Sequence, residues 1–436
     1  MIYASMMCHH RSLNELIQTN DCRTTNFKPL FKRTEYIPKM HGLRDCIIDT
    51  DYKQIENINK SVIQKAKENK VFNKNTIDGL RVMAWDGVEL TETNKDIDGL
   101  PEREHKDEGI RKYIKYLCAM NVGERANIMV ASKQLLEVEK VTSKSGKERA
   151  KTIGETTAFQ EMYSDVEKQV GGVIDVHVFD ALYLDQYVTN MINKKGKYFV
   201  IRLKEERLSI YKDAKGLFEK QTPKEEYEIV EIIIEKEVKY SKKAKHKDYK
   251  KTKIKREKRS ITKNKLNKKV LIEEKVSERK NSKVKIRIYE KVVVRKQVWS
   301  DLFEMEGYIG KVRVVRALET SESSNGKEKT NEIYVVTNML NHPIETVIKI
   351  MHLRWNIENN GFRTMKQQYN LEHIFIGNLN AINYIVQMMF LVFNLKELYM
   401  KIRLKEKVKI SYLVFKKIFE SEIHNTKEMW KLFEPD

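Results

Sequence analysis

Residues 80–87 read LRVMAWDG, and residues 173–180 read VIDVHVFD. Both stretches are apolar runs that end in an acid. Because successive side chains of a strand point to opposite faces, Asp86 shares a face with Val82 and Ala84. Asp180 shares a face with Val176 and Val178 in the same way. Each stretch is therefore predicted to be a strand with a carboxylate at its carboxyl end.

Carboxylates at the ends of neighbouring strands supply the hard oxygen ligands that Mg²⁺ or Mn²⁺ prefers. With a third acid from a packed helix, such a cluster can hold two ions for an in-line phosphoryl displacement. The competing interpretation is a turn, because Asp-Gly after a strand commonly forms one. Asp78-Gly79 is read as such a turn, and the role of Asp86-Gly87 stays open at this stage.

Glu358 is the candidate third acid. A helix starting near Pro343 is predicted, with its apolar positions on one buried stripe: Ile344, Ile348, Met351, Trp355, Phe362 and Met365. Glu358 falls on that stripe, where an unpaired charge costs several kcal/mol. Arg354, one turn earlier, is the expected partner. A plain Arg–Glu pair that only holds helices in register is an equally open interpretation.

These segments resemble bacterial insertion-sequence transposases of the DDE type. The segment Leu353–Phe362, followed by Lys366, looks like their Tyr-Arg-Glu-Lys signature region, and the segments around Asp86 and Asp180 look like their two Asp motifs. Residues 154–158, GETTA, resemble the start of the intervening helix. Met351 stands where the family usually has Tyr, and Lys366 follows Glu358 by one residue more than the commonest spacing, which would rotate Lys366 around the helix.

The resemblance covers roughly residues 70 to 400 and implies an α/β, ribonuclease-H-like mixed sheet flanked by helices. It implies a metal-dependent transposase that cleaves element ends and joins them to target DNA. Asp86, Asp180 and Glu358 would hold two Mg²⁺ or Mn²⁺ ions. Arg354 and Lys366 would contact phosphates of double-stranded DNA, with a possible homodimer in a synaptic complex.

The charge balance fits a nucleic-acid partner. The chain has 83 Lys and Arg against 62 Asp and Glu, a net charge of +21. Residues 239–269 hold 16 Lys or Arg and two acids, so this run alone carries +14. A solvated basic loop that binds any polyanion is the competing interpretation.

The flanks of this run alternate like strands, with Lys285 and Arg287 opposite apolar neighbours. A β-rich insertion with one apolar and one cationic face is therefore predicted to bind DNA. Tyr240, Tyr249 and Trp299 are candidates for stacking on unpaired bases, although buried packing is favoured for Trp299.

The element order predicts a ribonuclease-H-like core, β-β-β-α-β-α-β. We expect five segments: a helical N-terminal segment (1–75), for which a shortened DNA-recognition region is one interpretation; the first part of the catalytic core (76–204); the basic β-rich insertion (205–338); the second part of the core with the Glu helix (339–405); and a C-terminal tail (406–436).

Four Cys without a CxxC pair predict a reducing compartment without disulfides or structural zinc. The longest apolar run, residues 384–395, is too short to span a bilayer and reads as a buried helix. We expect a bacterial cytoplasmic, nucleoid-associated protein. Two alternatives stay open: a catalytically degraded or domesticated DNA-binding derivative, and a nonspecific basic nucleic-acid-binding protein.

Overall fold

The computed structural model describes residues 39–404, apart from 108, 143–147, 205, 207, 241–248, 263–264, 280–281 and 324, together with 411, 414–415 and 417–419. The chain divides into two compact units. Unit 1 comprises residues up to Phe199 and from Lys349 onward, and unit 2 comprises Val200–Ile348.

The sheet of unit 1 is built on β1 (Val82–Thr93), which pairs antiparallel with β3 (Gly109–Val122) and parallel with β7 (Val176–Phe179). On its other side β3 pairs with β4 (Asn127–Gln134) and, at its start, with β2 (Glu102–His105). Val82, Met83, Ala84 and Trp85 of β1 are all fully buried, so this strand is the centre of the core. The parallel β1–β7 pair brings the carboxyl ends of both strands to the same edge.

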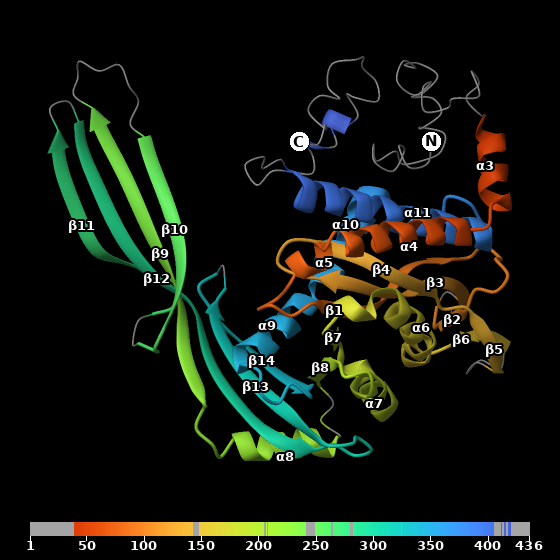
Figure 1. Cartoon of the computed structure of the whole chain (residues 1–436), viewed down its shortest axis with the longest axis horizontal. Coiled ribbons are helices and arrows are strands. Elements are labelled where there is room, and N and C mark those ends of the chain that lie inside the picture. The colour runs from red at the N-terminus through yellow and green to blue at the C-terminus, as the bar shows by residue number, and fades with distance from the viewer. Residues whose placement is uncertain are drawn as a thin grey trace. The chain divides into compact units, whose positions relative to one another are not determined.

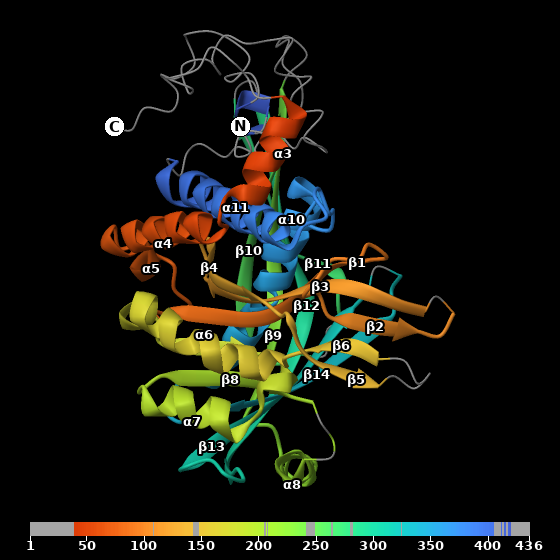
Figure 2. The same cartoon turned by 90° about the vertical axis from the view of Figure 1, so that its right-hand side faces the viewer.

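Helices cover this sheet on both faces (Figures 1 and 2). On one face, α4 (Lys53–Glu68) lies beside the long buried helix α11 (Leu379–Glu397), and the Asn394 side chain donates to Asn59 at 2.8 Å. On the other, α6 (Glu155–Val170) packs against β3 and β4, and α7 (Gln186–Lys194) follows β7. The short helices α3 (Met40–Asp49) and α5 (Val71–Lys74) flank α4.

The predicted β-β-β-α-β-α-β order is confirmed, and the fold is the expected ribonuclease-H-like α/β arrangement. After α7, the first residue of β8 (Tyr198–Leu203) still belongs to unit 1, where its N–H donates to the Asp175 carbonyl at 2.9 Å. The sequence analysis did not anticipate β2 or the hairpin of β5 (Glu137–Thr142) and β6 (Glu148–Thr152). Both are rich in charge, so they carry little hydrophobic periodicity to detect.

Asp78-Gly79 is the predicted turn. Both residues have positive φ, 49° and 83°, and the flanking Ile77 and Leu80 exchange backbone hydrogen bonds of 2.8 and 2.9 Å. Gly tolerates this conformation without cost, and Asp is among the residues that enter it most readily. The chain therefore turns at Asp78-Gly79 just before it enters β1 at Val82.

The predicted helix after Pro343 is present but interrupted. It begins as α9 (Ile344–Arg354), passes into the π-helical turn η4 (Ile357–Phe362) and continues as α10 (Arg363–Tyr369). Five of the six predicted stripe residues are buried, and Trp355 is half-buried. The expectation that Glu358 faces the core is wrong, because its side chain is 48% exposed. The chain leaves the α-helical phase just before Glu358, so the periodicity that predicted its burial does not extend across this point.

Unit 2 is mainly one antiparallel sheet with the order β10-β9-β12-β13-β14-β8, and β11 pairs with β12. Its strands are β9 (Glu225–Tyr240), β10 (Tyr249–Arg259), β11 (Lys269–Arg279), β12 (Ser282–Glu304), β13 (Lys311–Glu322) and β14 (Glu328–Thr337). Helix α8 (Ser209–Phe218) packs against β12 and was not anticipated. β9 and β12 are long strands, as Figure 1 shows.

At the termini, the predicted helical character near residues 12–16 and most of the predicted tail 406–436 lie outside the described residues. Within the described part, the predicted buried helix over residues 384–395 is confirmed as part of α11, which is followed by the π-helical turn η5 (Leu398–Arg403). None of the helices in that part is long and apolar enough to cross a membrane.

Candidate active site

The register of β1 and β7 positions the two candidate Asp residues. The last paired residues of the two strands are Ala84 and Val178. Two residues further along each strand come Asp86 and Asp180, and the backbone of Asp180 is still extended, with φ −78° and ψ 175°. Continuing the parallel register therefore places Asp180 alongside Asp86, with both side chains on the faces of Ala84 and Val178.

Asp86 lies within β1 and does not form a turn. The strand continues through Gly87 to Thr93. The Gly87 N–H donates to Asp86 Oδ1 at 2.9 Å, and the Arg354 Nη1 donates to Asp86 Oδ2 at 2.8 Å. Both carboxylate oxygens of Asp86 are thus held in place. The turn interpretation of Asp86-Gly87 is wrong.

Arg354 joins Asp86 to Glu358. Its Nη2 lies 2.9 Å from Glu358 Oε1, so one guanidinium contacts two candidate catalytic acids. The Arg354 side chain is only 4% exposed, whereas that of Glu358 is 48% exposed. The predicted Arg354–Glu358 pair is confirmed, but the buried member of the pair is the arginine.

The pKa of the Asp86 carboxyl group is strongly perturbed. Its pKa is raised to about 7, mainly by burial and in part by the nearby Glu358 and Glu155, although Arg354 opposes the rise. An ionised carboxylate at this position is therefore unfavourable despite its arginine neighbour. Carboxyl groups perturbed in this way are common at functional sites because a further cation relieves them.

A fourth carboxylate, that of Glu155, lies next to Gly87, the residue after Asp86. Glu155 is the first residue of α6, where it accepts a hydrogen bond from the Tyr183 hydroxyl at 2.9 Å and pairs with Lys115 at 2.8 Å. A Cβ on Gly87 would lie 2.5 Å from the Glu155 carboxyl carbon, so a larger residue at position 87 would have to displace the Glu155 side chain. Burial, followed by the charge of Glu155, raises the pKa of Tyr183 and keeps its hydroxyl a donor.

Sequence reasoning missed this Glu155 network. The motif GETTA marked Glu155 as a helix start, and Lys115 is a charged residue within an apolar strand. Neither pattern shows that the two residues meet over Gly87, because that contact depends on how α6 packs on β1 and β3.

Asp180 contributes a carboxylate oxygen that is free to bind a cation. Its Oδ1 is buried and has no hydrogen-bond partner among the described residues. A buried acceptor without a partner is costly, and such atoms need an explanation such as a bound ion or water. This observation makes Asp180 compatible with a metal ligand.

The turn η4 alters the position of Lys366. The Arg363 N–H donates to the Glu358 carbonyl, five residues earlier, so one turn contains an extra residue. A spacing of eight residues across a π-turn therefore brings Lys366 to about the orientation that seven residues reach in a regular α-helix. The expected rotation of Lys366 around the helix is wrong. Its Nζ lies 3.3 Å from the carbonyl of Glu89 on β1, three residues after Asp86, and 2.7 Å from Glu372.

Met351, which stands where the resembling family usually has Tyr, is a core residue and is 5% exposed.

The donor set fits a divalent cation in its chemistry. Asp86, Asp180 and Glu358 offer only carboxylate oxygens, which suit Mg²⁺ or Mn²⁺. Among the residues that the structure describes, no three His, Cys, Asp or Glu side chains already converge as a metal site. Arg354 instead provides the positive charge between Asp86 and Glu358.

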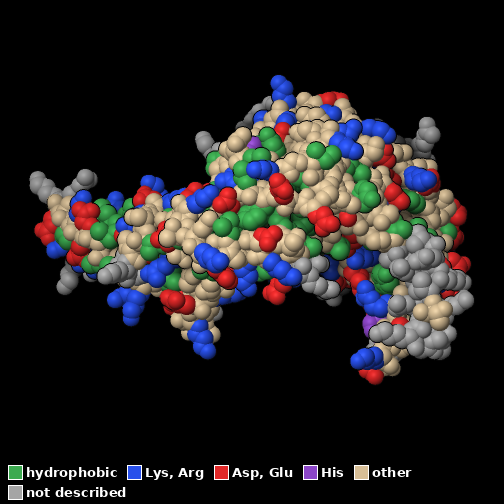
Figure 3. All heavy atoms as spheres, turned by 90° about the horizontal axis from the view of Figure 1, so that it is seen from below, with side chains coloured by type: hydrophobic (Ala, Val, Ile, Leu, Met, Phe, Trp, Pro, Cys, Tyr) green, Lys and Arg blue, Asp and Glu red, His purple; other side chains and the backbone are tan. Residues whose placement is uncertain are grey.

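The predicted DNA-binding residues of unit 2 lie in a mixed-charge ladder. Lys285 and Arg287 of β12 both pair with Glu274 of β11, at 2.7 and 2.8 Å. The expectation of a purely cationic face is wrong here, because the strand register places Glu274 of β11 directly across from Arg287 and Glu237 of β9 directly across from Lys285. On the face drawn in Figure 3, basic and acidic side chains are intermixed.

Trp299 is buried within unit 2, as the packing interpretation predicted. It is 6% exposed, its Nε1 donates to the Gln221 carbonyl at 2.9 Å, and the Arg316 guanidinium lies 4.4 Å from its ring centroid. Stacking of an unpaired base on Trp299 would require these contacts to open. Within the described residues, Tyr249 begins β10.

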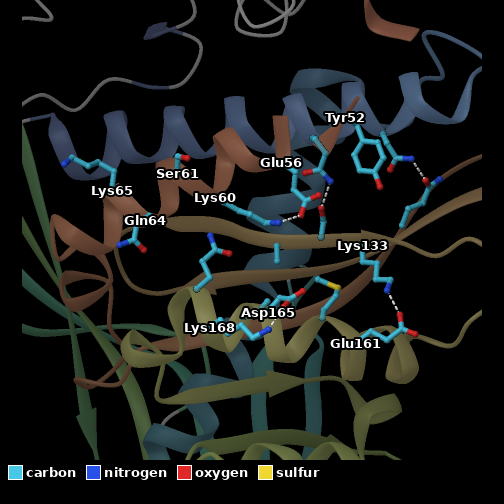
Figure 4. A pocket seen from close by; sticks show the side chains of 18 of the residues that line it. Tyr52, Glu56, Lys60, Ser61, Gln64, Lys65, Lys133, Glu161, Asp165 and Lys168 are labelled. Carbon is cyan, nitrogen blue, oxygen red and sulfur yellow. Dashed lines mark hydrogen bonds and ion pairs between the residues drawn. The ribbon is translucent and has the colours of Figure 1, made fainter. Parts of the chain in front are cut away.

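A cleft of about 920 Å³ lies elsewhere in unit 1, between α4 and α6 (Figure 4). Its floor is formed by β4, and its walls carry both signs of charge, including Lys60, Glu56, Lys133 and Glu161. None of the candidate catalytic acids lines it. This cleft is therefore separate from the acid cluster at the end of β1.

Comparison with protein families agrees with the geometry at the acid cluster. The family model described as "Transposase DDE domain" matches residues 147–395, more than half of the chain. The matched range includes Asp180, Glu358 and Arg354, and Asp86 precedes it. The comparison with curated proteins finds no match. By its ribonuclease-H-like core and this match, the chain belongs to the transposase DDE domain family.

Proposed function

We propose that this transposase cleaves the ends of an insertion sequence and joins them to target DNA by two-metal-ion phosphoryl transfer. The observation that carries the proposal is the meeting of Asp86 and Glu358 at one guanidinium. The two acids come from distant parts of the chain, and Asp180 lies on the strand that runs parallel to β1.

Asp86, Asp180 and Glu358 would hold the ions, Mg²⁺ or Mn²⁺. When bound, such ions activate an attacking hydroxyl and stabilise the leaving oxygen of the phosphodiester. The chain's own residues prepare this site. The Gly87 N–H orients Asp86, and Glu155, held by Lys115 and Tyr183, fixes the strand behind it. The buried Asp180 Oδ1 provides an acceptor that needs no rearrangement.

Double-stranded DNA is the proposed partner, both as element ends and as target. Arg354 and Lys366 would contact phosphates beside the acids, where a guanidinium can bind two oxygens at once. Lys285 and Arg287 would add contacts from unit 2. Their pairing with Glu274 means that DNA must compete with an internal acid, so their contribution is expected to be small and salt-dependent. A homodimer would hold two ends together.

The test is a cleavage assay on DNA that carries the terminal repeats flanking the reading frame, with Mg²⁺ or Mn²⁺. Asp86→Asn, Asp180→Asn and Glu358→Gln should each abolish cleavage while retaining DNA binding. Glu161→Gln is the matched control, because Glu161 forms an exposed pair with Lys133 far from these acids. Cleavage that persists in all three variants would reject the assignment. Specific end binding by the wild type without any nicking would instead identify a degraded derivative.

A further inference from the structure

Arg354 is the least exposed charged side chain around the acid cluster. Its Nη1 and Nη2 contact Asp86 and Glu358, while its Nε is buried without a partner among the described residues. Among the described residues, the Arg354 guanidinium thus contacts two acids that the proposed function assigns to metal binding. Within the described part of the chain, its two ion pairs are those with Asp86 and Glu358.

This arrangement creates a competition. A divalent cation held by Asp86 and Glu358 would compete with Arg354 for the negative charge of these two carboxylates. Release of those carboxylates would leave a buried guanidinium without a counter-charge, which is strongly unfavourable. A new anion would remove that penalty, and a DNA phosphate offers oxygens with the geometry that a guanidinium prefers.

We propose that Arg354 is an exchangeable counter-cation that couples metal binding to DNA binding. Without metal, it neutralises Asp86 and Glu358. With metal bound, it turns to a phosphate of the DNA. The inference rests on the proposed function and extends it, because it makes the two ligands cooperative: each should bind more tightly when the other is present, and by the same factor.

The first measurement is Mn²⁺ binding to the full chain without DNA, by calorimetry or electron paramagnetic resonance. Arg354→Gln removes the competing cation, so its Mn²⁺ dissociation constant should fall about fivefold or more. Arg81→Gln is the matched control, because Arg81, the residue before β1, also forms an Arg–Asp pair, with Asp175. It should leave the Mn²⁺ affinity unchanged. A dissociation constant in Arg354→Gln that equals or exceeds that of the wild type would overturn the inference.

The second measurement is the coupling itself, from binding of a fluorescent terminal-repeat duplex with and without Ca²⁺. The wild type should bind the duplex about fivefold more tightly with Ca²⁺, and Arg354→Gln should show a factor near one. Equal coupling in both proteins would also overturn the inference. If Arg354→Gln does not fold, Arg354→Met provides the same test, because it also removes the positive charge while an unbranched apolar side chain fills the buried space.

These outcomes distinguish a failure of the Arg354 exchange from a failure of the proposed metal site. If Asp86→Asn and Glu358→Gln leave Mn²⁺ binding unchanged, the assigned metal site is wrong, and the role of Arg354 falls with it. If those variants lose Mn²⁺ binding but Arg354→Gln binds it no more tightly than the wild type, only the exchange is wrong.

Discussion

The carboxylate of Glu155 occupies the space where a side chain on Gly87 would lie. A Cβ on Gly87 would come within 2.5 Å of the Glu155 carboxyl carbon and 2.8 Å of its Oε2. A larger residue at position 87 would therefore have to displace the end of the Glu155 side chain, and this glycine lies within a continuous strand, not in a turn. The contact connects the start of α6 to the strand that carries Asp86.

Gly87→Ala should displace Glu155 from Lys115 and Tyr183 and shift Asp86. Overpacking of this kind costs roughly 1–3 kcal/mol of unfolding free energy. We expect that loss by chemical denaturation, together with loss of DNA cleavage. Gly172→Ala is the control, because nothing lies within 4 Å of the added methyl group there. Full cleavage by Gly87→Ala would show that Glu155 does not support the site.

The π-turn predicts that one residue can be deleted from η4 with only a modest loss of stability. Removing the exposed residue Asn360 should convert η4 into regular α-helix, because a π-turn contains one residue more than an α-turn. The faces of Arg354 before it and Met365 after it should then be retained. Circular dichroism and denaturation should show a folded protein with only a modest loss of stability.

Deletion of Thr364, within α10, is the matched comparison. It should rotate every later residue of the helix by about 100° and expose the core residues Met365 and Tyr369. Strong destabilisation by both deletions, to the same degree, would contradict the role of the π-turn as the site of the extra residue.

Asn394 closes part of the open edge of β4. Its side-chain amide accepts from the Met129 N–H and donates to the Met129 carbonyl, each at 2.7 Å, as a neighbouring strand would. Asn394→Ala leaves both backbone groups buried and unsatisfied, so we expect a loss of roughly 2–4 kcal/mol in the free energy of unfolding. Gln387→Ala, which removes a single bond to the Ser132 hydroxyl, should cost clearly less. Equal losses would show that the Met129 groups find other partners.

The burial of His177 predicts that the protein loses stability in mild acid. His177 is fully buried, it accepts from Trp85 Nε1 at 3.0 Å through Nδ1, and its Nε2 lies 3.4 Å from Glu167. Burial lowers the pKa of His177, although Glu167 opposes this and Lys197 adds to it. Below the unfolded value of about 6.5, the unfolded chain takes up a proton that the folded chain resists. The contribution of His177 to stability is therefore complete above that pH and is lost as the pH falls below it.

Denaturation at pH 8, 7, 6 and 5 checks this sign. The wild type should lose stability below pH 6.5, and His177→Gln, which keeps an acceptor for Trp85 but does not titrate, should lose less over the same interval. An identical pH profile for the two proteins would remove His177 as the cause.

The element order was readable from the sequence because it depends on local periodicity. The strands that contain Asp86 or precede Asp180, the helix after residue 153 and the buried helix over 384–395 all follow patterns that a single segment carries. The expectation that the first of these strands ends at Asp86 is wrong, because β1 continues to Thr93. The predicted boundaries of the insertion, 205–338, stay a prediction. The burial of Glu358 was predicted wrongly because the π-turn interrupts the pattern on which that expectation relied.

Local sequence thus determined which segments form the core strands and helices and which of them carry an acid, since side-chain alternation is a property of neighbouring residues. Only the tertiary structure decided that Arg354 is the buried partner of both Asp86 and Glu358, that Glu155 lies over Gly87, and that Glu274 pairs with both Lys285 and Arg287. The physical reason is that strand register and helix packing place side chains from distant segments within a few ångströms, where charge and burial act on them together.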